Sequence, residues 1–416
     1  MIEKQVAGEL MPSTRLSSIT TIPHVPFPFI ECQNRILKAR QLMKSNSFDA
    51  LLITSEHNFR YFVDDTSTTP VQTTRPRFLL LLTSGEVIAV VPTGLDDFLR
   101  ETTWIQDFRT WPGPNPRDEG VSEVTSLLNQ LLPENARIGI ELGPESRLGV
   151  SGGDFLRIAE AIRPRVFEDA SEPIMTPLRM IKSDGEIDRI RTVCETVSHV
   201  FDNLTQQLYS GMTEREASRL FELECFKRGV DKTTKIDGAS GHGGYSRCYG
   251  EPTDKVMSGG DVLFIDAGCQ FNFYWCDFNR NFSFGEADPH TQDAYRAVWE
   301  ATEVGISAAQ PGIPICNVWT AMSDSLSQLR HRGKSSNIGR MGHSMGLWMP
   351  ELPSVQQNDN TVLEAGMIVN IEPSMTYPSY FDGSSKLMLH EEVVVITESG
   401  AKLLTSRAPR QIPVVK

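Results

Sequence analysis

The chain has 416 residues, of which 39% are hydrophobic and 22% are charged, as in an ordinary globular protein. This length exceeds what one simple core holds, so two domains are expected. The net charge of −13 argues against nucleic acid and against an anionic membrane surface as partners, because both need clustered Lys and Arg. No stretch approaches the roughly 20 apolar residues that span a bilayer.

The amino terminus and the cysteines together predict a cytoplasmic location. The first residues lack the basic segment and the apolar segment of a secretion signal. The seven cysteines include no Cys-x-x-Cys pair, and their odd number fits reduced thiols better than a disulfide framework.

Residues 1–172 are expected to form an arm followed by a small α/β domain. Residues 1–30 are rich in Ser, Thr and Pro, which predicts an irregular arm. In residues 31–172 strand patterns alternate with helical patterns, which is typical of an α/β domain. The expected elements are a helix over 31–45, strands over 48–54 and 137–141, and a hairpin over 77–92.

Residues 173–416 are expected to form a second domain. The sequences Ser183-x-x-Glu186 and Thr213-x-x-Glu216 match the capping box that begins a helix. Helices are predicted over 183–208, 213–229, 289–309 and 314–332, and strand-rich segments over 261–284 and 367–397. Two helices followed by strands, twice over, indicate two similar halves that face each other, although their sequences differ too much to be called a repeat.

Two aspartates beside apolar strands are the first residues that suggest chemistry. Asp266 ends the apolar run 262–265, and Asp277 lies in a second β-rich run. Two antiparallel strands joined by a tight turn would place these carboxylates side by side, where they repel unless a cation lies between them. Arg280 is a candidate for orienting one of the carboxylates. The alternative for Asp266 alone is a turn at the end of a strand, since Asp-Ala-Gly is common in turns.

Three further residues repeat this pattern of polar groups beside apolar strands. His343 lies between glycines, where the backbone can approach a ligand closely, although a lone His in such a loop is also a common structural residue. Glu372 ends one strand-like run, and Glu391 lies between two others. Acids beside buried strands are costly unless they are paired, and bound metal ions would explain all of them together.

In order and context these five residues resemble the metal ligands of the pita-bread metallohydrolases, which include prolidase, aminopeptidase P, methionine aminopeptidase and creatinase. The resemblance covers residues 45–405 and extends to short phrases near the ligands. These phrases are Met180-Ile-Lys-Ser183, Gly260-Asp261, Gly342-His343, Gly366-Met367, Ile371-Glu-Pro373 and Thr397-Glu-Ser-Gly400. The resemblance implies a small N-terminal α/β domain, a catalytic domain of two pseudo-symmetric halves with curved antiparallel sheets, and a homodimer.

The resemblance also implies two divalent metal ions, bridged by Asp277 and Glu391. Asp266 would bind one ion, and His343 and Glu372 would bind the other. Four carboxylates and one imidazole favour Mn²⁺ or Fe²⁺, with Zn²⁺ or Co²⁺ as alternatives. A water or hydroxide shared by the ions would attack a carbonyl-type carbon, and Glu372 would act as the general base.

The chain lacks two histidines that hold the substrate carbonyl in the peptidases of this family. One position is Tyr249, which still offers a hydrogen bond and is a catalytic candidate, and the other is Pro350, which offers no donor. Glu351 follows this proline as in the family motif and is a further catalytic candidate. His242 and His390 are candidate substitutes for the lost histidines, with an ordinary surface or packing role as the alternative for each.

Substrate binding is expected to involve the N-terminal domain. In creatinase-type dimers an arginine of this domain reaches the active site of the partner and binds the substrate carboxylate, and Arg75 is the candidate for that role. The alternative is a solvated arginine before an edge strand. Tyr61 is a further candidate for lining the same pocket.

Three functions follow from these observations. The leading hypothesis is a dinuclear metallohydrolase that cleaves a C–N bond in a small amino-acid-derived compound or an Xaa-Pro dipeptide. The second is a metal-dependent lyase acting on a small carboxylate such as dimethylsulfoniopropionate. Such lyases also lack both histidines, but they carry an acid where this chain has Gly268. The third is a non-catalytic binding protein on the same fold, which the retention of all five ligands disfavours.

Overall fold

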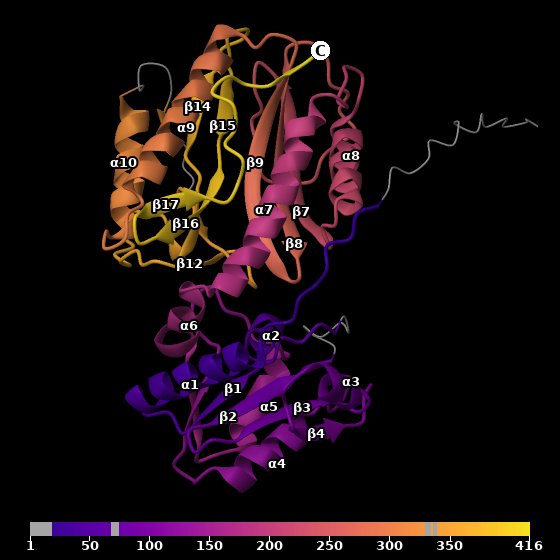
Figure 1. The fold of residues 1–416 in the computed structure, drawn as a ribbon, viewed down its shortest axis with the longest axis vertical. Coiled ribbons are helices and arrows are strands. Elements are labelled where there is room, and N and C mark those ends of the chain that lie inside the picture. The colour runs from indigo at the N-terminus through magenta and orange to yellow at the C-terminus, as the bar shows by residue number, and fades with distance from the viewer. Residues whose placement is uncertain (1–18, 68–74, 329–333, 336–338) are drawn as a thin grey trace, which may run out of the picture.

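A mixed six-stranded sheet, in the order β4-β3-β2-β1-β5-β6, forms the centre of the N-terminal domain (Figure 1). The computed structural model describes residues 19–67, 75–328, 334–335 and 339–416. The strands are β1 (Ala50–Ile53), β2 (Phe78–Leu82), β3 (Val87–Pro92), β4 (Asp107–Trp111), β5 (Arg137–Ile140) and β6 (Val166–Asp169). The predicted hairpin is the antiparallel pair β2 and β3, in which Phe78 lies opposite Val90.

Helices cover both faces of this sheet, which explains why its central strands are apolar throughout. Successive side chains of a strand point to opposite faces, so Leu51 and Ile53 pack in one core cluster and Leu52 packs in another. The first cluster includes residues of α1, and the second includes residues of α4 and α5. The helices of this domain are α1 (Phe29–Ser45), α2 (Glu56–Val63), α3 (Leu95–Thr102), α4 (Val121–Leu131) and α5 (Gly152–Ala161).

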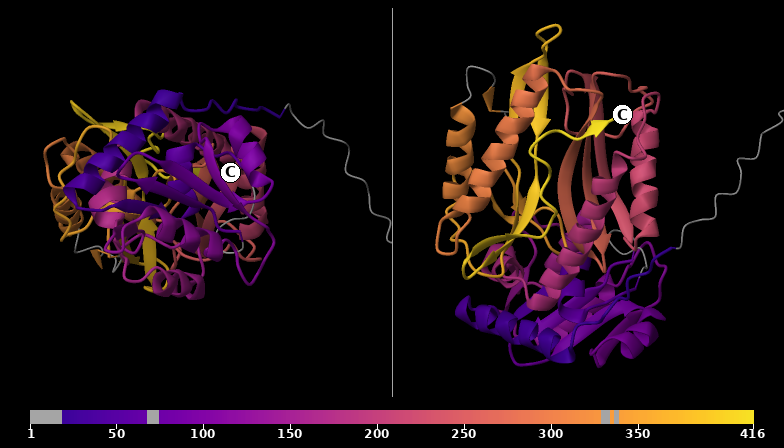
Figure 2. Two further views of the ribbon diagram at one scale, coloured as in Figure 1. Left: turned by 90° about the horizontal axis from the view of Figure 1, so that it is seen from below. Right: turned by 45° about the horizontal axis from the view of Figure 1, so that its top comes forward.

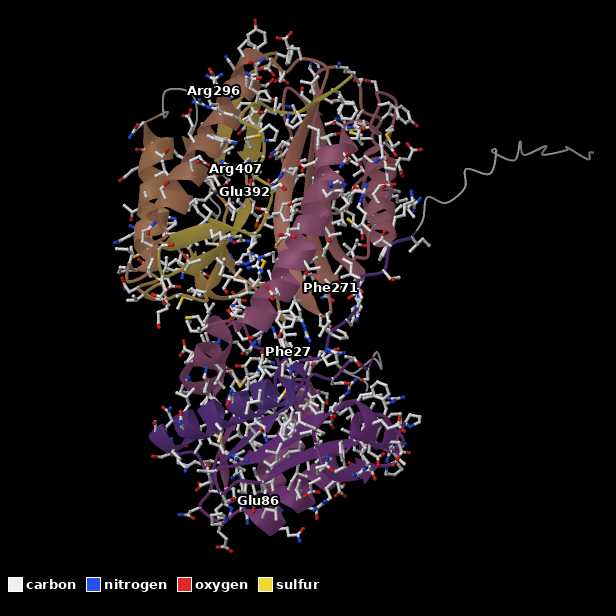
Figure 3. The ribbon with its side chains drawn as sticks, in the orientation of Figure 1. Phe27, Glu86, Phe271, Arg296, Glu392 and Arg407 are labelled. Atoms are coloured by element: carbon white, nitrogen blue, oxygen red, sulfur yellow. The ribbon has the colours of Figure 1, made fainter. Side chains whose placement is uncertain are left out.

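The described part of the predicted arm, residues 19–28, runs along the C-terminal domain before α1 begins. The amide of Thr20 donates to the carbonyl of Lys227 at 2.8 Å. The ring of Phe27 packs edge-on against Tyr274, and Figure 3 shows Phe27 and Phe271 where the two domains meet. Residues 1–18 of the predicted arm lie outside the described residues.

The two domains are joined by the π-helix η1 (Ser171–Met175) and the short helix α6 (Thr176–Met180), which lead into α7 (Asp184–Leu204) and α8 (Glu214–Lys227). Both predicted capping boxes are present. The Ser183 hydroxyl accepts from the Glu186 amide at 3.2 Å, and the Glu186 carboxylate accepts from the Ser183 amide at 3.0 Å. Thr213 makes the same pair of bonds at the start of α8. The starts of both helices were therefore predictable from local sequence, whereas α7 ends at Leu204 and α8 at Lys227, a few residues before the predicted ends.

The first half of the C-terminal domain contains a four-stranded sheet in the order β18-β9-β8-β7. Its strands are β7 (Lys232–His242), β8 (Asp261–Phe271), β9 (Tyr274–Phe284) and β18 (Val414–Val415). A two-residue turn joins β8 to β9, and both turn residues have positive φ, 46° at Asn272 and 67° at Phe273. This conformation is typical of the turn that matches the twist of a tight hairpin.

The second half contains a five-stranded sheet, β12-β11-β13-β16-β17, and a three-stranded sheet, β10-β14-β15. Its elements are α9 (Pro289–Ala308), α10 (Ile315–Ser327), β10 (Lys334–Ser335), β11 (His343–Ser344), β12 (Glu351–Ser354), β13 (Ile368–Ile371), β14 (Ser374–Pro378), β15 (Ser385–Leu389), β16 (Glu392–Thr397) and β17 (Gly400–Leu403). The helix predicted over 314–332 ends at Ser327, and residues 329–333 lie outside the described residues.

The strands of the two halves lie between the helix pairs α7–α8 and α9–α10, as Figures 1 and 2 show. As predicted, an N-terminal α/β domain precedes a second domain of two facing halves. None of the helices in the described ranges is long and apolar enough to cross a membrane.

Candidate metal centre

The β8–β9 hairpin brings Asp266 and Asp277 to one face of the first sheet. Gly268 lies directly opposite Asp277, and Asp266 is two residues from Gly268, so both carboxylates share a face. Both aspartates are buried. The register of this hairpin thus explains why the two carboxylates lie on the same face of the sheet.

The second half contributes three more residues to the same place. His343 begins β11, Glu372 follows β13, and Glu391 lies between β15 and β16. Ligand atoms of Asp277, His343 and Glu391 all lie within 4.8 Å of one another. His343 and Glu391 are buried, whereas Glu372 is partly exposed. Ligand candidates from both halves therefore converge where the halves face each other.

Because these carboxyl groups are buried and close together, ionising all of them is unfavourable. Burial raises the pKa of Asp266 to about 6, with the neighbouring Asp277 adding to the effect and Lys235 opposing it. Burial, followed by the charge of Asp266, raises the pKa of Glu372 to about 8. Burial and the charge of Glu372 hold the pKa of Glu391 well above its usual range.

The donor set fits a divalent metal ion. Asp266 Oδ1 is buried and accepts no hydrogen bond within the described residues, which leaves a lone pair available to a cation. Four carboxylates and one imidazole suit Mn²⁺, Fe²⁺, Co²⁺ or Zn²⁺. A divalent cation would also remove the repulsion between the carboxylates.

Two asparagines hold the ligand side chains in place. Asn279 Nδ2 donates to Glu391 Oε2 at 3.0 Å, and Asn370 donates to the other oxygen of the same carboxylate. The side-chain oxygen of Asn370 accepts from the amide of His343. Nδ1 of His343 lies 2.9 Å from the carbonyl of Ser344, so that Nε2 is the nitrogen that faces Asp277, and Asn370 Nδ2 lies 3.3 Å from it.

His343 is held in the neutral form that binds metals. Burial lowers the pKa of its imidazole to about 3, and the nearby charge of Arg340 lowers it further. Arg340 was not singled out from the sequence. Its guanidinium lies 3.3 Å from Ser354 Oγ and 3.4 Å from Glu145 Oε1.

Arg280 orients the segment that carries Glu391 and does so through the backbone. Its guanidinium donates to the carbonyl of Glu391 at 2.8 Å and to the carboxylate of Glu392 at 3.0 Å. Glu392 also accepts from Arg407 at 3.1 Å, and both residues are labelled in Figure 3. This buried ion-pair cluster fixes the start of β16 and, with it, the preceding Glu391.

Lys235 is a residue of the centre that the sequence analysis missed. Its Nζ lies 2.7 Å from Asp266 Oδ2 and 3.4 Å from Asp277 Oδ1. Burial alone would lower the pKa of Lys235, but Asp277, Asp266 and Glu391 outweigh burial and raise it. The pairing of Lys235 with Gly268 follows a β-bulge, and no local sequence feature announces that register.

Glu351 belongs to a separate buried cluster at the junction of the domains. Its carboxylate accepts from Arg179 of α6, from Lys182 at 3.3 Å and from the amide of Trp348 at 3.0 Å. Lys182 also donates to the hydroxyl of Ser344 at 2.9 Å, next to His343. The cluster thus connects the interdomain helix to the strand that carries a candidate ligand.

Three more candidates from the sequence are Tyr249, His242 and His390, and they differ in their exposure and their contacts. Tyr249 is 69% exposed, and burial of its hydroxyl followed by the charges of Cys248 and Glu372 raises its pKa. His242 packs against Phe381 with ring centroids 4.1 Å apart. His390 is buried and lies 3.1 Å from the hydroxyl of Thr302.

The two candidates in the N-terminal domain have partners within this chain. Tyr61 is buried, and its hydroxyl donates to the carbonyl of Leu178 at 2.9 Å. Arg75 pairs with Glu119 at 3.1 Å and lines a surface pocket of about 560 Å³ with residues of β3 and α3.

Two facing halves with a carboxylate-rich centre between them define the pita-bread class of metal-binding domains. Residues 188–398 match the model of metallopeptidase family M24, and residues 35–181 match the creatinase/prolidase N-terminal domain. The chain belongs to metallopeptidase family M24.

Several known proteins are similar to this chain. An Xaa-Pro dipeptidase of Pyrococcus furiosus is 30% identical over 237 residues, which cover 56% of this chain and 65% of that protein. An uncharacterised peptidase of Staphylococcus saprophyticus is 26% identical over 87% of this chain and 96% of its own length. A prolidase structure from Thermococcus sibiricus has a TM-score of 0.80 at 22% identity and covers 94% of this chain and all of that one. An Xaa-Pro dipeptidase structure from Bacillus anthracis has a TM-score of 0.78 at 21% identity, covering 92% of this chain and 99% of that one.

Proposed function

We propose that the protein is a metal-dependent hydrolase that cleaves a C–N bond in a small amino-acid-derived compound or an Xaa-Pro dipeptide. The observation that carries this proposal is the convergence of Asp277, His343 and Glu391, whose ligand atoms lie within 4.8 Å of one another. Similarity to Xaa-Pro dipeptidases supports the substrate class.

The proposed centre takes two divalent ions, with Mn²⁺ or Fe²⁺ favoured by its oxygen-rich donor set. Asp277 and Glu391 would be shared, Asp266 would serve one ion, and His343 and Glu372 would serve the other. Bound ions would supply Lewis acidity and activate water at neutral pH. The homodimer and the role of Arg75 in a partner's active site belong to the same proposal.

Residues of the chain itself would position the substrate and move the proton. Glu372 is the proposed general base, because it is the partly exposed member of the five and can meet substrate and water. Tyr249 is exposed, and its hydroxyl is the proposed hydrogen-bond partner of a substrate group. The partly exposed guanidinium of Arg340 offers a counter-charge for a substrate carboxylate.

A second candidate function is a metal-dependent lyase on a small carboxylate. It is favoured by the presence of Tyr249 and Pro350 where peptidases of this family carry histidines. Incorporation of oxygen from labelled water into the product separates the two reactions, since only hydrolysis adds water.

The experiment that tests the proposal compares the wild type with Asp277→Ala. Elemental analysis of the wild type is expected to give about two metal ions per chain, and an Xaa-Pro dipeptide is assayed in parallel. Asp277→Ala should lose bound metal and turnover, because it removes a carboxylate from the converging group. Asp324→Ala, at an exposed position of α10 outside the centre, is the control and should keep both. Full metal content in Asp277→Ala would refute the assignment.

A further inference from the structure

A lysine ammonium lies inside the candidate metal centre, among the oxygens expected to bind an ion. Lys235 Nζ is 2.7 Å from Asp266 Oδ2, and it is 3.4 and 3.5 Å from the two oxygens of Asp277. A fourth oxygen, Asp237 Oδ2, lies 3.8 Å away. One positive charge is thus shared by three carboxylates, whereas an ordinary surface lysine pairs with one.

The backbone fixes this position. A bulge in β7 between Thr233 and Lys235 sets Lys235 opposite Gly268, on the sheet face that carries both aspartates. A Cβ atom at Gly268 would lie only 3.0 Å from the Cβ of Lys235, so the glycine leaves room for the lysine stem. The bulge and the glycine together direct the ammonium at the centre.

The ammonium makes the two sides of the centre unequal. On one side, Asp277, His343 and Glu391 form the compact group that can hold an ion. On the other side, the contacts of Lys235 take up Asp266 Oδ2, while Asp266 Oδ1 stays available. The lysine side chain is 31% exposed, so it has an outward path if a stronger cation takes its place.

We propose that Lys235 is a built-in competitor for the ion on the Asp266 side of the centre. The inference rests on the proposed function, in that it assumes a metal centre at these residues. A divalent ion at the Asp277, His343 and Glu391 group shares one ligand, Asp277, with the ammonium. An ion at Asp266 has to displace Lys235 from two carboxylates, so this second ion binds more weakly. The second position is then filled only at a higher metal concentration than the first.

The test is a calorimetric titration of the full-length, metal-stripped protein with Mn²⁺, for the wild type and for Lys235→Met. Methionine keeps the length of the stem and removes the charge. The second ion should bind at least about tenfold more tightly to Lys235→Met, because a like charge within hydrogen-bonding distance of the ligand oxygens is gone. The affinity for the first ion should change less than that for the second, since the first ion shares only Asp277 with the ammonium and the second shares both Asp266 and Asp277.

Two further variants make the result specific. Lys232→Met removes an exposed lysine of the same strand and should titrate as the wild type does. Lys235→Arg keeps a positive charge and should keep the second ion weak. Binding of the second ion with equal affinity to the wild type and Lys235→Met would overturn the role of Lys235 while leaving the metal centre intact. Failure of every variant to bind Mn²⁺ would instead overturn the proposed function, and this inference with it.

Discussion

A substitution of Glu351 can distinguish a structural role from a catalytic one, because its carboxylate is buried and bonded to other residues of the protein. Its carboxylate accepts from Arg179, from Lys182 and from the amide of Trp348. The Lys182 side chain is only 1% exposed, and its other hydrogen-bond partner is the hydroxyl of Ser344. In Glu351→Gln both cations would lose this carboxylate, and the amide NH2 would turn a donor toward one of them.

The expected cost follows from that burial. Removing one partner of a buried ion pair costs about 3–5 kcal/mol, since the remaining charge stays desolvated. Glu351→Gln should therefore lower the free energy of unfolding by about that amount, a shift of the urea midpoint of about 1 M or more. The control Glu364→Gln changes an exposed carboxylate and should stay within about 0.5 kcal/mol of the wild type.

The effect should also depend on pH. Burial raises the pKa of Glu351, but Arg179 and Lys182 outweigh it and hold the pKa below its usual value of 4.5. A carboxyl with a depressed pKa contributes stability above its unfolded pKa and loses it as pH falls through the folded value. The difference between the wild type and Glu351→Gln should therefore be full at neutral pH and shrink below pH 4.5. Equal urea midpoints at pH 7, combined with lost turnover, would refute the structural role and favour the catalytic one.

Two further predictions concern the segments that position His343 and Glu391. Gly342→Ala should lower metal affinity and stability together, because a Cβ atom there would lie 2.1 Å from the carbonyl of Asn370 and φ is +132°; retention of metal after dialysis would contradict this. Asn370→Leu removes the bonds to Glu391 and His343 and should weaken metal binding by about 10–100-fold with the fold intact. Equilibrium dialysis alongside circular dichroism measures both quantities, and unchanged affinity would show that the asparagine does not hold the ligands.

Features set by neighbouring residues were predictable from the sequence. The capping boxes at Ser183 and Thr213 depend on a side chain and an amide three residues apart, and both formed as expected. The β2–β3 hairpin depends on two apolar runs and the short turn between them. The pita-bread fold itself came from the resemblance, which the order and context of the five candidate ligands carried.

Features set by pairing between distant segments were not predictable. Lys235 reaches the centre because a bulge sets the register between β7 and β8, and register cannot be read from either strand alone. Arg280 was expected to orient a carboxylate of the metal set, yet it binds the Glu391 carbonyl and the Glu392 side chain. The cluster of Glu351, Arg179 and Lys182 depends on how two domains meet, which no local pattern encodes.

The arm over residues 19–28 adds to the contacts that join the two domains besides α6. Its Thr20 amide bonds to Lys227 of the C-terminal domain, while its Phe27 amide donates to Asp64 of the N-terminal domain at 2.8 Å. Asp64 in turn pairs with Arg189 of α7 at 3.1 Å. A covalent connection alone would let one domain turn about it, whereas contacts at a distance from that connection restrict the turning. The arm near the N-terminus therefore helps to keep Glu351, Arg179 and Lys182 in their positions at the junction of the domains.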